Sequence, residues 1–140
     1  MAGDDAAGVL VARALRGRLP EDVELMEHEG EPTALLDAWS GKRLAIVVDA
    51  ISGDGPPGTV RSLDPTASPL PEGLDGTSTH AFTLAQAIEL GRALGRLPVR
   101  LLVVGIEGVH FKASDAPGQP VAAAIEPAAE AVLELLRTNY

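Results

Sequence analysis

Hydrophobic and polar positions along this 140-residue chain follow two patterns. In some segments apolar residues recur every three or four positions, which is the spacing of a helix with one buried face. Other segments are continuous apolar runs, which are typical of strands covered on both faces of a parallel sheet. The predicted helices span residues 6–16, 33–39, 81–95 and 127–137. The predicted buried strands are 44–50 and 101–106, with shorter or partly buried strands at 23–27 and 59–63.

The alternation of helices with buried strands predicts an α/β fold with three layers, α/β/α, around a twisted, mostly parallel sheet. The length favours a single domain over residues 1–140. Pro127 is expected in the first turn of the last helix, because proline suits that position. The helix residues expected to face inward are Gly8, Val11, Ala12, Leu15, Ala34, Leu35, Ala38, Leu84, Ala85, Ile88, Gly91, Ala128, Val132, Leu135 and Leu136.

Composition narrows the class of protein. Hydrophobic residues make up 46% and aromatics 3% of the chain, so the core must consist mainly of Leu, Val, Ile and Ala. The absence of cysteine excludes disulfides, a thiol nucleophile and a thiolate metal site. A net charge of −9 without a basic stripe argues against nucleic-acid binding. No apolar run approaches the roughly 18 residues of a membrane helix and no signal peptide is evident, so we expect a cytoplasmic protein without a membrane segment.

The ends of the predicted strands suggest where chemistry takes place. Open parallel sheets bind ligands beyond the carboxyl ends of their strands, and Asp49 lies at such an end. Ser78 or Thr79 is the predicted N-cap of the next long helix. His80 then falls in the first turn, where the helix dipole favours the neutral imidazole that binds metals. The alternatives, in which Asp49 caps a turn and His80 is a surface residue, remain open.

Asp4 and Asp5 form an acidic pair directly before the first predicted helix. Acidic residues are favoured in a first helical turn, so a capping role explains them equally well. Together with one imidazole, two carboxylates also form a ligand set for a borderline divalent ion. A catalytic triad of Ser78, His80 and Asp49 is disfavoured, because no G-x-S-x-G elbow is present and the serine and histidine are too close in sequence.

Other polar positions carry weaker signals. His28 follows the predicted strand at 23–27, and His110 lies in a polar loop. Glu107 ends a buried strand, where we expect it to form a hydrogen-bonding wall of a site. The glycine-rich segment 53–58 matches neither a phosphate-binding loop nor a dinucleotide fingerprint, so no organic cofactor is indicated. The polar stretches around these residues, 51–79 and 109–119, are long for plain connections, and long loops usually carry function.

Several segments resemble, in the same order, those of the hydrogenase maturation protease family. They are Gly3–Val9, Val47–Ala50, Pro56–Val60, Ser78–His80 and Gly105–Glu107. The resemblance spans nearly the whole chain. The family consists of endopeptidases that trim the C-terminal tail of the large subunit of nickel–iron hydrogenases after nickel insertion. Its fold, a twisted sheet flanked by helices, agrees with the pattern above, and the resemblance implies that this chain is such a peptidase.

The resemblance also implies roles for individual residues. Asp5, Asp49 and His80 would recognise nickel held by the large-subunit precursor, with Asp5 and Asp49 as candidate catalytic residues. The residues implied to cap or support them are Asp4, Ser78 and Thr79. A water activated by the metal and an acid–base role for either aspartate remain alternative chemistries. The competing functions are a nickel-sensing module that binds the precursor without cleavage, and an α/β domain with no metal site.

One departure from the family concerns the start of the chain. Family members have a buried strand and a Gly-x-Gly-Asn turn before the acidic pair, whereas three residues precede Asp4 here. We therefore expect a first strand to be missing, through a late-assigned start or a shortened form. Losing a central strand would remove an amount comparable with a typical domain stability of about 5–15 kcal/mol. Poor folding or low activity is the expected result, and a cooperative thermal melt of a stable monomer would contradict it.

Overall fold

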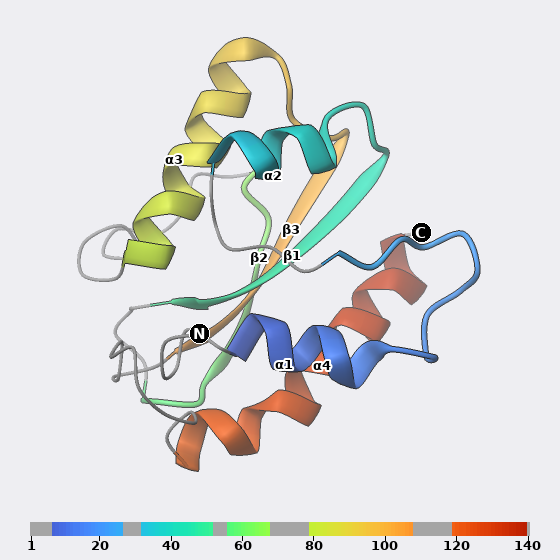
Figure 1. Ribbon diagram of the computed structural model, residues 1–140, viewed down its shortest axis with the longest axis vertical. Helices are drawn as coiled ribbons and strands as arrows, with labels where there is room; N and C mark the ends of the chain where they lie inside the picture. Colours follow the sequence, from blue (N-terminus) through green and yellow to red (C-terminus); the bar gives the residue numbers. More distant parts are fainter. Residues whose placement is uncertain (1–6, 27–31, 52–55, 68–78, 108–118, 140) are drawn as a thin grey trace.

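The computed structural model describes residues 7–26, 32–51, 56–67, 79–107 and 119–139. These residues form a three-layer α/β/α fold, as the sequence predicts (Figure 1). The elements are α1 (Ala7–Leu15), α2 (Pro32–Trp39), β1 (Leu44–Ile51), β2 (Val60–Leu63), α3 (Thr79–Leu94), β3 (Arg100–Glu107) and α4 (Gln119–Asn139). None of the described helices combines the length and the apolar character needed to cross a membrane.

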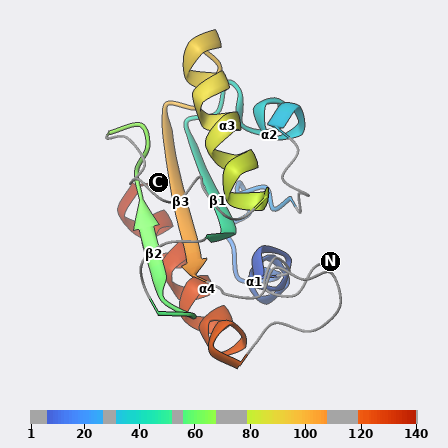
Figure 2. The ribbon, with the colours of Figure 1, turned by 90° about the vertical axis from the view of Figure 1, so that its left-hand side faces the viewer.

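The sheet is mixed. Within the described residues its strand order is β1-β3-β2, with β3 in the centre (Figure 2). β1 and β3 run parallel, from the pair Leu44 and Arg100 to the pair Ile51 and Glu107. The short edge strand β2 runs antiparallel to β3. The two predicted apolar runs thus form the parallel pair, and β2 corresponds to the short strand expected at 59–63.

Each face of the sheet is covered by two helices. Because side chains alternate along a strand, the even-numbered positions of β1 and β3 pack against α1 and α4. The odd-numbered positions, such as Val47 and Val103, pack against α2 and α3. The buried residues are mostly Leu, Val, Ile and Ala, as composition requires, with Trp39 as the large exception. Its indole Nε1 donates a hydrogen bond to the carbonyl oxygen of Arg96 at 3.0 Å.

Two expected elements differ from the structure. Val23 to Met26 belong to no strand, so the prediction for 23–27 is wrong over these residues, and Glu27 lies outside the described residues. A strand needs a neighbour to complete its hydrogen bonds, and local propensity alone does not supply one. The last helix starts at Gln119, and Pro127 lies inside it, not in its first turn. Tertiary packing continues this helix across the proline, because Ala124 and Ala128 on either side are both buried.

Most helix residues that were expected to face inward do so. The buried ones are Val11, Ala12, Leu15, Leu35, Leu84, Ile88, Gly91, Ala128, Val132 and Leu136. The half-buried ones are Gly8, Ala38, Ala85 and Leu135. Ala34 is exposed, so that prediction is wrong. In α2, Leu36 and Trp39 face the protein core instead, because larger apolar side chains gain more from burial than alanine does.

Candidate active site

The candidate site lies at the carboxyl end of the parallel strands. Figure 1 shows that the N-terminal ends of α1 and α3 both point to this end of β1 and β3. Strand ends in open α/β sheets leave a crevice there, because successive helices cover opposite faces. Two buried carboxylates, Asp49 and Glu107, come from neighbouring strands at this end. Among the described residues, these are the buried charged side chains.

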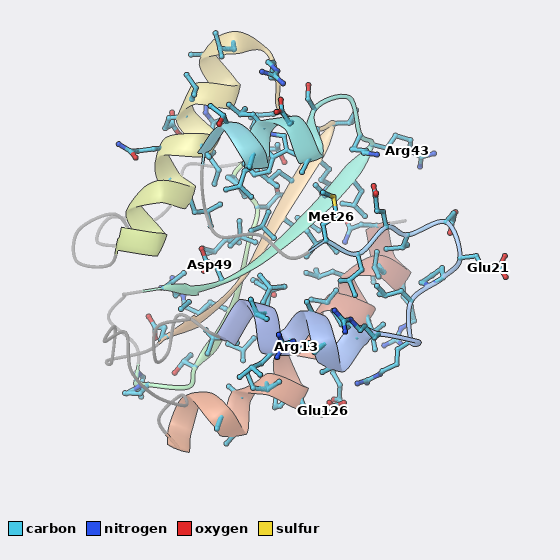
Figure 3. All side chains as sticks on the ribbon, in the orientation of Figure 1. Arg13, Glu21, Met26, Arg43, Asp49 and Glu126 are labelled. Carbon is cyan, nitrogen blue, oxygen red and sulfur yellow. The ribbon has the colours of Figure 1, made fainter. Side chains whose placement is uncertain are left out.

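Asp49 is held by its own strand. Its side chain is on the face covered by α2 and α3, since it is an odd-numbered position of β1 (Figure 3). The residue is 1% exposed, and Oδ1 accepts a hydrogen bond from the backbone N–H of Ala50 at 2.9 Å. This bond lies within β1, so the alternative in which Asp49 caps the following turn stays a prediction. The bond fixes the orientation of the carboxylate, which is compatible with a ligand role.

The first turn of α1 lies directly on the segment that carries Asp49. A Cβ atom placed on Gly8 would come within 2.6 Å of the Val48 carbonyl oxygen and 3.8 Å of the Asp49 Cα. Contacts below 3.0 Å with a backbone atom do not occur in real structures, so a glycine is required here. The helix that follows the acidic pair is therefore packed against the strand of Asp49. Asp4 and Asp5 themselves lie outside the described residues.

His80 is in the first turn of α3, because this helix begins at Thr79. Its place in the helix is therefore as the sequence predicts. The side chains of Thr79 and His80, and the whole of Ser78, His28 and His110, lie outside the described residues. No three acidic, histidine or cysteine side chains form a metal-binding group in the part of the chain that the structure describes. Asp49 is the described member of the predicted trio, and the trio stays a prediction.

Glu107 is the second buried carboxylate. It is 1% exposed, and neither of its side-chain oxygens accepts a hydrogen bond from the described residues. Arg61 of β2 is its ionic neighbour, with 3.7 Å between Nη1 and Oε1. Both backbone groups of Glu107 are bonded to the segment before β2: its N–H donates to the Thr59 carbonyl, and its carbonyl accepts from the Gly58 N–H. The backbone at the strand end is thus fixed, whereas the carboxylate receives no hydrogen bond from the described residues.

The register of the sheet places these groups on one face. Gly105 in β3 lies opposite Asp49 in β1 and opposite Arg61 in β2, and Glu107 follows two residues later. Residues two apart in a strand point to the same face, so all three charged side chains are on the side of α3. Ile51 fills the space above Gly105, because a Cβ there would lie 2.7 Å from its Cδ1. The two carboxylates and the guanidinium therefore lie on the same face of the sheet, and the apolar side chain of Ile51 covers Gly105 on that face.

Arg61 is the residue that reasoning from the sequence missed. It lies in a four-residue edge strand, and nothing in the pattern Val60 to Leu63 relates it to a residue far along the chain. Only the antiparallel register with β3 brings it beside Glu107. The one available signal was its charge in an otherwise uncharged strand segment.

Comparison with known proteins gives consistent results. The sequence model of the family described as hydrogenase maturation protease matches residues 9–135. The Hydrogenase 2 maturation protease of Escherichia coli (strain K12) is 32% identical over 139 residues, covering 97% of this chain and 84% of that protein. Both matches extend over most of the described elements.

Solved structures show the same fold. The hydrogenase maturating endopeptidase HybD from E. coli superimposes with a TM-score of 0.80 at 30% identity, covering 98% of this chain and 86% of that one. The [NiFe] hydrogenase maturation protease HybD from Thermococcus kodakarensis gives a TM-score of 0.70 at 20% identity, covering 96% and 91%, which is a likeness of fold alone. The chain therefore belongs to the hydrogenase maturation protease family and is a peptidase.

Proposed function

We propose that this protein is the endopeptidase that removes the C-terminal extension from the nickel-loaded large subunit of a nickel–iron hydrogenase, and that it acts in the cytoplasm. Family membership supports a processing endopeptidase. The observation that carries the finer proposal is the buried Asp49 carboxylate at the carboxyl end of β1. The backbone of this residue lies against the first turn of α1, and its side chain is on the opposite face, which α3 covers.

In this proposal Asp49, Asp5 and His80 recognise the nickel ion that the precursor brings with it. The nickel is thus part of the substrate. One imidazole and two carboxylates suit a borderline divalent ion. The fixed orientation of the Asp49 side chain supports this role, since Oδ1 accepts a hydrogen bond from the backbone N–H of Ala50. A precursor without nickel would lack the group that these residues hold.

Hydrolysis of the tail requires two proton movements. Water adds to the scissile carbonyl carbon and loses a proton, and the C–N bond breaks as the amine nitrogen gains one. A carboxylate held at the site can take the first proton and deliver the second. Asp49 and Asp5 are the candidates for this role. Burial makes Asp49 suited to it, because a carboxylate removed from water responds strongly to charge that develops beside it.

The direct test is cleavage of purified precursor. Nickel-loaded and nickel-free large-subunit precursors are incubated with the protein, and their masses are measured. The expected result is loss of the tail from the nickel-loaded form alone, with the released peptide detected in the same spectrum. Asp49→Asn is expected to stop this cleavage. Asp64→Asn is the matched control, because it changes an aspartate at the opposite end of the sheet.

Two results would contradict the proposal. Binding of the precursor with no tail removal by the intact protein would favour the alternative, a nickel-sensing module without cleavage. Absence of both binding and cleavage would favour a domain with no role in precursor processing. Equal cleavage of nickel-loaded and nickel-free precursors would leave a peptidase but remove nickel recognition from the proposal.

A further inference from the structure

Glu107 is a buried carboxylate without hydrogen-bond donors among the described residues. Within the described residues no N–H or O–H group donates to Oε1 or Oε2, although the side chain is only 2% exposed. A carboxylate removed from water and left without donors is strongly destabilising unless something else supplies them. The backbone of the same residue is fully bonded, so the strand end does not depend on the side chain. These features are typical of a group that awaits a ligand.

Arg61 completes the local arrangement. Its Nη1 is 3.7 Å from Glu107 Oε1, too far for a hydrogen bond but close enough to balance the charge. Its side chain is 33% exposed, so the guanidinium reaches solvent while the carboxylate does not. An acceptor and a donor therefore lie side by side on the face of the sheet that carries Asp49.

We propose that Glu107 and Arg61 together bind the main chain of one extended residue of the substrate, which rests on the proposed function in requiring a peptide substrate. Glu107 accepts the N–H of that residue and Arg61 donates to its carbonyl oxygen. A residue in an extended chain is a neutral ligand whose main-chain donor and acceptor point to the same side, next to each other. A further cation would be repelled by Arg61, and an anion would be repelled by Glu107.

The sheet geometry gives the place of this bound residue in the substrate. Arg61 and Asp49 are in register on either side of Gly105, and hence two strand spacings apart. Two spacings amount to roughly 10 Å, the length of about three residues of extended chain. A substrate that crosses the strand ends would place its reacting bond at Asp49 and the bound residue about three residues away. Glu107 and Arg61 are then substrate-binding residues that do not touch the reacting atoms.

Variants of the pair test the proposal through kinetics. Cleavage of nickel-loaded precursor is measured over a range of precursor concentrations for the intact protein, Glu107→Leu and Arg61→Gln. Each variant is expected to raise KM about tenfold or more while kcat stays within about twofold, because hydrogen bonds to charged groups are lost from binding. Arg100→Gln is the matched control, since it removes an arginine–carboxylate pair at the other end of β3, and its KM is expected to be unchanged.

Thermal melting separates binding from a structural role. Leucine keeps most of the volume of Glu107 and removes its charge, so Glu107→Leu is expected to melt at the same temperature or higher. A clear fall in melting temperature with an unchanged KM would overturn the proposal and make the pair structural. If Glu107→Leu does not fold, Arg61→Gln decides alone, because Arg61 is on the edge strand and partly exposed.

Direct binding distinguishes failure of this inference from failure of the proposed function. A synthetic peptide spanning the cleavage site of the precursor is titrated into the intact protein and the same variants by calorimetry. Weaker binding by both variants, even if the intact protein cleaves nothing, would support the peptide-binding pair while the proposed function fails. Cleavage and binding that are equal in the intact protein and both variants would overturn the pair and leave the proposed function in place. A peptide that the intact protein does not bind would overturn the pair, whereas the proposed function is decided by cleavage of the nickel-loaded precursor.

Discussion

The two ends of the sheet each hold a carboxylate beside an arginine, but the two carboxylates differ in the hydrogen bonds that they accept. At the amino end of β3, Asp64 is 3.0 Å from Arg100 and accepts hydrogen bonds from the backbone and hydroxyl of Thr66. At the carboxyl end, Glu107 is more deeply buried, lies farther from Arg61 and accepts no hydrogen bond within the described residues. The oxygens of Asp64 are thus occupied by hydrogen bonds and an ion pair within the fold. The oxygens of Glu107 accept no hydrogen bonds from the described residues and can accept them from a ligand.

The pKa of Asp64 shows how thoroughly the fold uses it. Burial alone would raise this pKa, but hydrogen bonds from Thr66 and Ala67 and the charge of Arg100 outweigh burial and hold the pKa below its ordinary value. The folded state therefore favours the ionised form, and Asp64 ties the turn after β2 to the start of β3. The donors around a buried carboxylate, more than the presence of an arginine, therefore separate a structural pair from a candidate ligand-binding pair.

The largest expected difference between the two ends is in activity. Asp49→Asn is expected to lower the rate of tail removal about 100-fold or more, which is the scale of an acid–base group. The melting temperature should change little, because asparagine keeps the oxygen that accepts from Ala50. Asp64→Asn at the opposite end should leave the rate unchanged. Equal losses of cleavage rate in the two variants would contradict this difference between the two ends of the sheet.

The next effect concerns how α1 meets the strand of Asp49. Gly8→Ala is expected to lower the free energy of unfolding by about 2 kcal/mol, because its Cβ would contact the Val48 backbone oxygen at 2.6 Å and the helix must move. The matched variant is Gly91→Ala in α3, whose Cβ would meet only the flexible ends of Leu36 and Leu97 at 2.9 Å. Urea unfolding of both variants measures the difference. Equal losses would show that α1 can move away from β1 without strain.

Removing the bonded carboxylate at the amino end should cost stability alone. Asp64→Ala is expected to lower the free energy of unfolding by about 1–2 kcal/mol, since Thr66 and Ala67 lose their acceptor and Arg100 its partner. Chemical unfolding gives the stability, and precursor cleavage under folding conditions checks that the rate is kept. A variant as stable as the intact protein would mean that these bonds contribute nothing net.

The smallest expected effect is the pH dependence of that contribution. Because the pKa of Asp64 is lower in the folded state than its ordinary value of 3.8, its stabilising effect is fully present above that value. The effect is lost as the pH falls through the folded pKa. The stability difference between the intact protein and Asp64→Asn, on the order of 1 kcal/mol or less, should therefore shrink below about pH 4. Thermal melts from neutral to acidic pH test this, and a difference that stays constant would refute it.

Much of the fold can be predicted from the sequence because its signals are local. The apolar runs that became β1 and β3, and the helical spacing in α1 and α3, depend only on residues near one another in the chain. Val23 to Met26 failed as a strand because strand formation depends on a partner that local sequence does not reveal. The first half of α4 was missed because Pro127 was expected in the first turn of the helix, where proline is favoured, and only packing on the core extends the helix before it.

The candidate site divides in the same way. Asp49 at a strand end and His80 in a first helical turn follow from local patterns, and the structure places both segments accordingly. Glu107 was expected at a strand end, but its shortage of donors depends on everything packed around it. Arg61 could not be predicted, because its position relative to Glu107 is set by the register between two strands that are distant in sequence.

The proline inside α4 has a consequence for local opening of the molecule. Pro127 has no N–H, so the helical hydrogen bond that would join the two halves of α4 at this point is absent, and Figure 1 shows the helix bending near its middle. The second half packs with α1 and the sheet through Ala128, Val132 and Leu136. Amide hydrogens of residues 119–126 are therefore expected to exchange with solvent by unwinding of a short segment, while those of the second half wait for the core to open.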